Sequence, residues 1–324
     1  MTTATQQGPR AAAGTPAGAA PAVGPPAGPN RRAHRNRSGN LPPGERRSTL
    51  LTVLLWLCGG YFLLPLVWLV VASTKDNTGL FTSFGFWFAD DFRLGDNLAT
   101  LFTLQDGVFG QWILNTVLYS VVSGVGAALL STAAGYAFAK YEFPGKRLWF
   151  AVVLGAVMVP TTALAIPTYL LFAGAGLTNT VWAVILPSLV SPFGVYLMRI
   201  FAEEAVPDSL VEAARIDGAG EFRIFWQIVL RLLAPGIVTV LLFALVATWN
   251  NYFLPLIMLT DPKLFPLTVG LAQLQAASEA GGGASAQFST VITGSLVSVL
   301  PLIVAFLYLQ RYWQSGLSAG SVKE

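Results

Sequence analysis

The distribution of charged residues constrains this chain more than any other feature of its sequence. Five stretches contain no Asp, Glu, Lys or Arg: 48–74, 107–139, 148–198, 232–260 and 280–310. A helix needs about 20 apolar residues to cross the roughly 30 Å hydrocarbon core of a bilayer. Four of the stretches fit one crossing each, and 148–198 fits two with a turn between them. The sequence therefore predicts an all-α polytopic membrane protein with six transmembrane helices, at about 49–72, 112–138, 148–172, 180–199, 234–258 and 289–309.

The overall composition excludes most soluble classes. Only 11% of the residues are charged and 54% are hydrophobic, whereas a soluble domain carries about 25% charged residues. Residues 1–47 are different, because Ala, Pro and Gly dominate them and large apolar side chains are almost absent. Such a segment has little to bury. We expect a disordered tail at 1–47, followed by a six-span domain at 48–324.

Lys and Arg lie mostly on one side of the predicted bundle. With a cytoplasmic N-terminus, that side holds 16 of the 19 Lys and Arg residues, and the other side holds only Lys75, Arg93 and Lys263. Cytoplasmic loops of membrane proteins are enriched in these two residues. We therefore expect both termini to be cytoplasmic.

Residue counts exclude several catalytic and metal sites. Cys58 and His34 are the only residues of their kinds, which leaves no CxxC site, no histidine-based zinc site and no Ser–His–Asp triad. Gly145-Lys146 lacks the other residues of a phosphate-binding G-x-x-x-x-G-K-[ST] loop, so we expect no nucleotide hydrolysis by this chain alone. No acidic or basic residue lies between the ends of a predicted span, which argues against ion coupling.

The predicted spans carry two further patterns. Two rows of small residues follow one another on the second span: Gly124/Ala128/Thr132 and Ala127/Ser131/Gly135. They fit close packing either within the chain or against another subunit. The first external loop is rich in aromatic residues, which fit an interfacial belt or an external partner: Phe81, Phe84, Phe86, Trp87, Phe88 and Phe92.

The cytoplasmic segment 200–233 joins the fourth and fifth predicted spans. Ser209 and Glu212 have the S-x-x-E spacing of a capping box, and Gly218 can end the helix by adopting φ > 0. A second, amphipathic helix is predicted by apolar residues three or four apart: Phe222, Phe225, Ile228, Val229 and Leu232. From the residues alone, this segment also fits an interfacial helical hairpin with no partner.

One motif in this segment resembles the EAA loop of permease subunits of ATP-binding-cassette importers: Glu212-Ala213-Ala214-Arg215-Ile216-Asp217-Gly218-Ala219, followed by Phe225 and Ile228-Val229-Leu230. The segments 265–271 and 310–323 are similar to the carbohydrate branch of that family, the maltose-type second permease. The resemblance covers 49–324. It departs at Arg231, where the family usually has proline, and we expect Pro235 to take over part of that break.

The resemblance implies a division of labour among several chains in the plasma (inner) membrane of a bacterium. This chain would pair with a second permease subunit, as a heterodimer, to form a pathway for a sugar or oligosaccharide. Two cytoplasmic ATP-binding subunits would bind ATP and Mg²⁺, and an extracytoplasmic substrate-binding protein would deliver the substrate. The chain itself would need no cofactor, contact membrane lipid and bind no nucleic acid. Contact with the ATPase would fall to Glu212, Ala213, Ala214, Asp217 and Gly218, although capping alone also explains Glu212.

The pathway itself is harder to place. Polar and aromatic groups in apolar spans suit hydroxyl-rich ligands, and buried hydrogen bonds between helices explain them equally well. The candidates are Thr161, Thr162, Tyr169, Asn250, Asn251 and Tyr252. A secondary transporter, or a membrane-bound enzyme without an ATPase partner, is the alternative to an importer permease. The first would require inverted repeats with polar breaks, and the second would require clustered acids or histidines.

Overall fold

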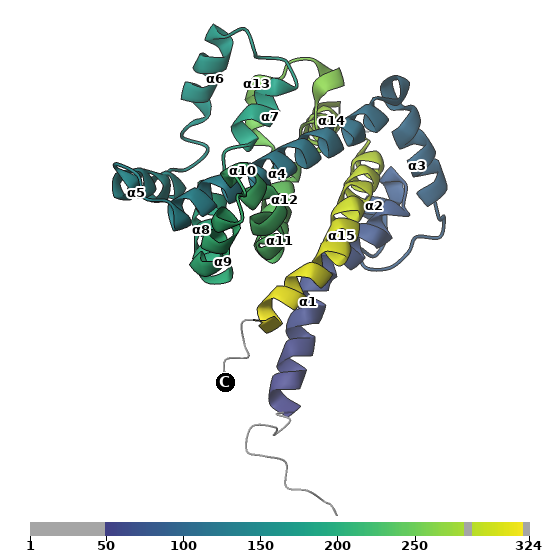
Figure 1. Cartoon of the computed structure of the whole chain (residues 1–324). Helices are drawn as coiled ribbons and strands as arrows, with labels where there is room; N and C mark the ends of the chain where they lie inside the picture. The colour runs from purple at the N-terminus through teal and green to yellow at the C-terminus, as the bar shows by residue number, and fades with distance from the viewer. Residues whose placement is uncertain (1–48, 282–286, 320–324) are drawn as a thin grey trace, which may run out of the picture. The chain divides into compact units, whose positions relative to one another are not determined.

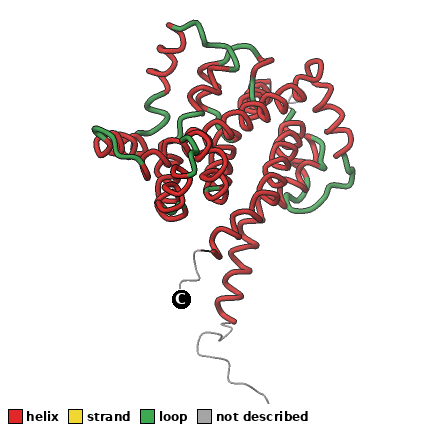
Figure 2. The backbone as a smooth tube through the Cα atoms, in the orientation of Figure 1, coloured by secondary structure: helices red, strands yellow, loops and turns green. Residues whose placement is uncertain are grey.

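A computed structural model describes residues 49–281 and 287–319 of the chain. In these ranges the backbone forms helices, turns and loops and no strand (Figures 1 and 2). The predicted disorder of residues 1–47 concerns a segment outside the described residues. The helices are α1 (Thr49–Ser73), α2 (Asn77–Thr82), α3 (Leu94–Thr103), η1 (Leu104–Gly107), α4 (Val108–Lys140), α5 (Lys146–Val157), α6 (Ala165–Gly174), α7 (Trp182–Ser188), α8 (Pro192–Ala205), α9 (Asp208–Ile216), α10 (Glu221–Ile224), η2 (Phe225–Val229), α11 (Leu230–Leu232), α12 (Ala234–Trp249), α13 (Phe253–Met258), η3 (Pro262–Leu264), α14 (Leu267–Gly281) and α15 (Phe288–Ala319).

The chain divides into two units, one up to Trp56 and one from Leu57 onward. Of the first unit the structure describes only 49–56, the beginning of α1, where every side chain is exposed. All the other helices belong to the second unit. The packing and the sites described below lie within it.

Four described stretches are long and apolar enough to cross a membrane: Thr49–Ser73, Leu94–Lys140, Trp182–Ala205 and Phe288–Gln310. A fifth crossing is possible if Glu221–Leu232 and Ala234–Trp249, which are bent by 80° at their junction, count as one span. The predicted all-helical membrane fold is thus confirmed, with four or five apolar spans.

The third predicted span, 148–172, differs most from the expectation. The structure divides it into α5 and α6, separated by turns at 158–164. Pro160 lies in this break and has no N–H to donate to a helix, and Thr161 and Thr162 are poor helix formers. The predicted spans 180–199 and 234–258 are interrupted as well, at 189–191 just before Pro192 and at 250–252.

α4 is the helix against which much of the second unit packs (Figure 1). Near its first half, one hydrophobic cluster gathers Phe109, Trp112 and Tyr119 with residues of α7 and of 258–274. Near its second half, another cluster joins Ala128 and Tyr136 to α8, α9 and the start of α12. The interior of the unit is therefore built around this helix.

The small residues of α4 face other helices of the same chain. A Cβ placed on Gly124 would lie 3.4 Å from Leu245 of α12. A Cβ on Gly135 would lie 2.6 Å from Met198 and 2.7 Å from the backbone nitrogen of Arg199, both on α8. Packing within the chain therefore accounts for these glycines, which were expected to permit close approach.

The last predicted external loop, 259–288, is mostly helical because it contains α14. Its first residues are fastened to α4 by side chains that donate to backbone carbonyls. Trp112 Nε1 donates to Pro262 O at 2.9 Å, and Tyr119 Oη donates to Leu264 O at 2.8 Å. In the first predicted external loop, the six aromatic side chains from Phe81 to Phe92 are exposed.

Candidate functional site

The coupling segment, residues 207–233, begins with a helix start that differs from the predicted one. Pro207 precedes α9 in an extended conformation, and no side chain caps the first turn. Ser209 is already the second residue of the helix, so the predicted capping box with Glu212 is wrong. Proline fixes φ near −65° and lacks an N–H, which makes it a good residue at a helix start. Pro207 is the residue just before the helix, so α9 begins at Asp208, one residue before Ser209.

The end of α9 matches the prediction. Gly218 has φ = +79°, a left-handed conformation that favours glycine. Its N–H donates to Arg215 O at 3.0 Å, and the next N–H, of Ala219, donates to Ala214 O at 3.0 Å. This pair of bonds is the Schellman motif, which satisfies carbonyls that the helix end leaves free. The turn after α9 is therefore fixed by hydrogen bonds.

α9 has one face in the protein and one face in solvent. Val211 and Ala214 are buried in the cluster shared with α4 and α8. Glu212 and Ala213 are exposed, and the Ile216 side chain is 86% exposed. Burying an exposed isoleucine side chain such as this one would stabilise the protein or its complex by about 1.5–3 kcal/mol. α9 thus presents an acidic, small and apolar surface that suits a protein partner.

Polar contacts fasten the coupling segment to the end of α4. Lys140 Nζ donates to Asp208 Oδ1 at 2.7 Å. Glu221, the first residue of α10, accepts from Arg215 Nε at 2.7 Å with Oε1 and from the Tyr141 hydroxyl with Oε2. These bonds, the one from Arg215 above all, hold the pKa of Glu221 below its ordinary value. Burial, together with the Glu221 carboxylate, raises the pKa of Tyr141. Near pH 7, Glu221 and Arg215 are therefore charged and the Tyr141 hydroxyl is neutral.

The second helix of the segment contains a π-helical turn that the periodicity did not predict. α10 continues into η2 and α11, with Leu230 N–H donating to Phe225 O, five residues back. The wider turn shifts the buried face, so Ile224, Val229 and Leu233 are fully buried while Phe222 is 77% exposed. The apolar residues of the predicted amphipathic row are therefore not all buried within the chain, and the π turn changes the helical period after Phe225.

The break between this helix and the fifth predicted span lies where Pro235 predicts it. The helix continues through Arg231 and ends at Leu232, and α12 starts at Ala234 with Pro235 in its first turn. The two pieces meet at the 80° bend. Pro235, four residues after Arg231, thus stands at the start of the new helix, and the chain changes direction there without a proline at position 231.

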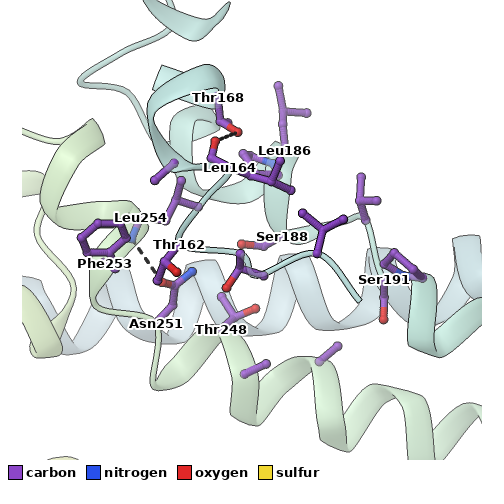
Figure 3. A pocket seen from close by; sticks show the side chains of 18 of the residues that line it. Thr162, Leu164, Thr168, Leu186, Ser188, Ser191, Thr248, Asn251, Phe253 and Leu254 are labelled. Atoms are coloured by element: carbon purple, nitrogen blue, oxygen red, sulfur yellow. Dashed lines mark hydrogen bonds between the residues drawn. The ribbon is translucent and has the colours of Figure 1, made fainter. Parts of the chain in front are cut away.

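The second candidate site is a cavity of about 950 Å³ in the second unit (Figure 3). All three interruptions of the predicted spans contribute to it, from 158–164, 189–191 and 250–252. Broken helices expose backbone groups that hydrocarbon cannot satisfy. At membrane depth, such breaks are tolerated where they face protein or a water-filled cavity. The positions of the breaks are therefore consistent with a hydrated cavity.

Five of the six predicted pathway residues line this cavity: Thr161, Thr162, Asn250, Asn251 and Tyr252. Asn251 accepts a long, 3.4 Å bond from Leu254 N, and Asn250 Nδ2 donates to Val246 O at 3.0 Å. Tyr169 lies on α6 and is not among the lining residues. The structure thus brings together residues that are about 90 positions apart in the sequence.

Sequence reasoning missed four further hydroxyl residues in the lining: Thr168, Ser188, Ser191 and Thr248. Ser188 and Ser191 lie beside Pro187 and Pro192, so hydroxyls next to prolines in an apolar span were the signal that could have revealed them. Ser191 also accepts from Gly194 N at 3.1 Å as the N-cap of α8. Among the described lining residues none carries a formal charge. The cavity can bind by hydrogen bonding and apolar contact.

Comparison with known proteins settles the family. Residues 127–316 match the family described as "Binding-protein-dependent transport system inner membrane component". This match extends from α4 to α15 and includes the coupling segment and all the residues given above as lining the cavity. The chain belongs to this family.

Individual members of the family support the assignment along most of the chain. The arabinooligosaccharides transport system permease protein AraQ of Halalkalibacterium halodurans is 34% identical over 277 residues, which cover 85% of this chain and 96% of that protein. The diacetylchitobiose uptake system permease protein NgcG of Streptomyces coelicolor is 29% identical over 281 residues, covering 86% of this chain and 90% of that protein.

A solved structure shows the same fold. This chain superposes with a TM-score of 0.70 on a chain of a bacterial ABC transporter involved in the import of the acidic polysaccharide alginate. The two are 23% identical, and the match covers 82% of this chain and 95% of the other. As a binding-protein-dependent transport component, the chain is an inner-membrane transport subunit and not an enzyme. Nothing favours the membrane-enzyme or secondary-transporter alternative.

Proposed function

We propose that this chain is one of two permease subunits of an ATP-driven importer for a sugar or oligosaccharide. Relatives that are named for arabinooligosaccharides and diacetylchitobiose support the substrate class. The observation that carries the proposal is the cavity, where hydroxyl and amide groups from three interrupted spans meet without a formal charge among the described lining residues. Such a lining suits an uncharged, hydroxyl-rich substrate.

The topology completes the proposal. Residues 48–324 form a six-span permease domain, residues 1–47 a cytoplasmic tail, and both termini are cytoplasmic. α5 and α6 together supply the crossing that neither helix is long enough to make alone. The excess of Lys and Arg on the side of the coupling segment supports this orientation.

The coupling segment contacts a cytoplasmic ATP-binding subunit. Glu212, Ala213, Asp217 and the nearby Ile216 form the exposed surface, while Ala214 packs inward and Gly218 fixes the turn. Two such ATPases bind ATP and Mg²⁺, a second and different permease completes the pathway, and an extracytoplasmic binding protein delivers the substrate. This chain then needs no cofactor of its own.

Purification of the tagged chain from its native membranes tests the proposal. We expect a second permease and an ATP-binding subunit to purify with it, because the exposed surface of α9 lacks a cover within the described chain. ATP hydrolysis by that complex should rise when the binding protein and its sugar are added. A chain that purifies without other subunits and transports sugar in proteoliposomes would contradict the proposal.

A substitution in the cavity tests the pathway. Thr248→Val replaces a hydroxyl that lines the cavity with a methyl of similar size. Because a neutral hydrogen bond is worth about 0.5–1.5 kcal/mol, we expect sugar uptake at low concentration to fall by roughly two- to tenfold. Thr239→Val is the matched control, since Thr239 lies on the same helix with similar burial and donates to Pro235 O at 2.9 Å. Equal uptake by the two variants would remove Thr248 from the pathway.

A further inference from the structure

Glu221 is placed differently from the other carboxylates of the cytoplasmic segment. Its two oxygens bind groups from two different elements, Arg215 on α9 and Tyr141 at the end of α4. The Arg215 guanidinium also lies 5.9 Å from the centre of the Tyr141 ring. One side chain thus joins α9, the helix of the coupling surface, to the end of α4.

We propose that Glu221 is a positioning residue that transmits movement of α9 to α4. The proposal rests on the proposed contact between α9 and an ATP-binding subunit. If the ATPase displaces α9 during its cycle, the Arg215–Glu221–Tyr141 bridge makes α4 follow it. Without the bridge, the C-terminal end of α9 loses its hydrogen-bonded link to α4, and the Lys140–Asp208 pair at the start of α9 and the apolar packing of Val211 and Ala214 remain.

The groups at both ends of the bridge are rigid. Arg215 lies in the last turn of α9, whose following turn is fixed by the Schellman bonds of Gly218 and Ala219. On the other side, the Tyr141 ring packs edge-on against Tyr136, 5.5 Å away between ring centres, and Tyr136 in turn packs against Phe225. The backbone that carries Arg215 and the ring of Tyr141 are therefore held in place, and the bridge between them runs through the partly exposed Arg215 and Glu221 side chains.

α4 is packed closely enough to carry the movement further. The close approach at Gly135 leaves no room for a side chain between α4 and α8. α4 also packs along α12. Ser191 of α8 and Thr248 of α12 both line the cavity. The bridge thus stands at the start of a continuous path of packed helices from the coupling surface to the cavity wall, and coupling free energy can pass along such a path.

The test uses two variants and one matched control in the complete importer, reconstituted in proteoliposomes with its binding protein. Glu221→Gln removes the charge at nearly constant size, and Tyr141→Phe removes the hydroxyl but keeps the packed ring. Glu142→Gln is the control, because Glu142 directly follows Tyr141 in the chain and its 90% exposed side chain pairs with Lys146, four residues further on. The quantity measured is the number of ATP molecules hydrolysed per sugar transported.

We expect Glu221→Gln and Tyr141→Phe each to raise the ATP hydrolysed per sugar by about fivefold or more, with the ATPase subunits still bound. The double variant should be no worse than the single ones, because both remove the same bridge. A ratio like that of Glu142→Gln would overturn the proposal. So would a loss of ATPase subunits with an unchanged ratio in the complexes that remain, since that result assigns Glu221 a structural role. A wild-type chain without ATP-driven transport would instead contradict the proposed function itself.

Discussion

Replacing Gly218 with valine is expected to separate the chain from its ATP-binding subunit while leaving it in the membrane. A β-branched residue at φ = +79° is strained, at a cost of about 1–3 kcal/mol. A Cβ at this position would meet no atom within 4 Å, so the cost comes from the backbone and not from a clash. Relief of the strain would break the Schellman bonds and turn α9 away from its position. The measurement is retention of the ATPase in detergent pull-downs, together with substrate-stimulated ATP hydrolysis.

Gly220 provides the control for this prediction. It lies two residues further on, and a Cβ there would also meet nothing within 4 Å. Its φ and ψ of −71° and 158° are extended backbone that valine adopts readily. Gly220→Val should therefore retain the ATPase and keep at least most of the stimulated hydrolysis. Equal behaviour of the two variants would show that the conformation of Gly218 does not position the coupling surface.

The sequence predicted the end of α9 and failed at its start, and both outcomes have local causes. Glycine adopts a positive φ more readily than other residues and commonly follows the end of a helix, so the positive φ at Gly218 could be expected. The helix start had two competing signals, the Ser209–Glu212 spacing and Pro207. The structure follows Pro207, and Ser209 makes no cap. Capping preferences are worth only about 1 kcal/mol, so a single neighbour can overrule them.

The approximate positions of the apolar segments could be predicted because hydropathy reflects transfer to lipid, but the structure has four or five stretches that could cross a membrane instead of the predicted six. The interruptions were harder to predict. Prolines such as Pro160 and Pro192 were visible as possible bends, but a proline can kink a helix or end it, and packing decides between the two. Pro65 and Pro301 lie inside α1 and α15, which continue through them. The breaks that form the cavity therefore required the structure.

Contacts between distant side chains were beyond sequence reasoning. The Tyr141 hydroxyl and the Glu221 carboxylate are 80 residues apart in the chain, and no periodic pattern relates them. The same holds for the cavity, where Thr162 and Asn251 both line the wall because the interruptions at 158–164 and 250–252 fall at one place (Figure 3). Residue type could suggest that Asn250, Asn251 and Tyr252 were functional, but it could not separate them from Tyr169, which lies outside the lining.

Glu212→Ala is expected to weaken binding of the ATP-binding subunit without disturbing this chain. Glu212 is exposed on α9, and its carboxylate makes no hydrogen bond or ion pair with the described part of the chain. Since the capping box is absent, the carboxylate has no role in starting the helix, and alanine is the better helix former. A charge-assisted contact to a basic group of the ATPase is worth about 1.5–3 kcal/mol. The affinity for the ATPase should therefore fall by roughly 10- to 100-fold.

Glu204→Ala separates this effect from a general loss of negative charge. Glu204 is also exposed and cytoplasmic in the proposed topology, but it lies on the last turn of α8 and outside α9. The measurement is the salt-dependent affinity of detergent-purified chain for the ATPase, with the melting temperature of each variant recorded beside it. Glu212→Ala should bind weakly at an unchanged melting temperature, and Glu204→Ala should bind like wild type. If Glu212→Ala binds the ATPase with wild-type affinity, the ATPase does not contact this carboxylate, and binding must instead involve the exposed Ala213 and Ile216.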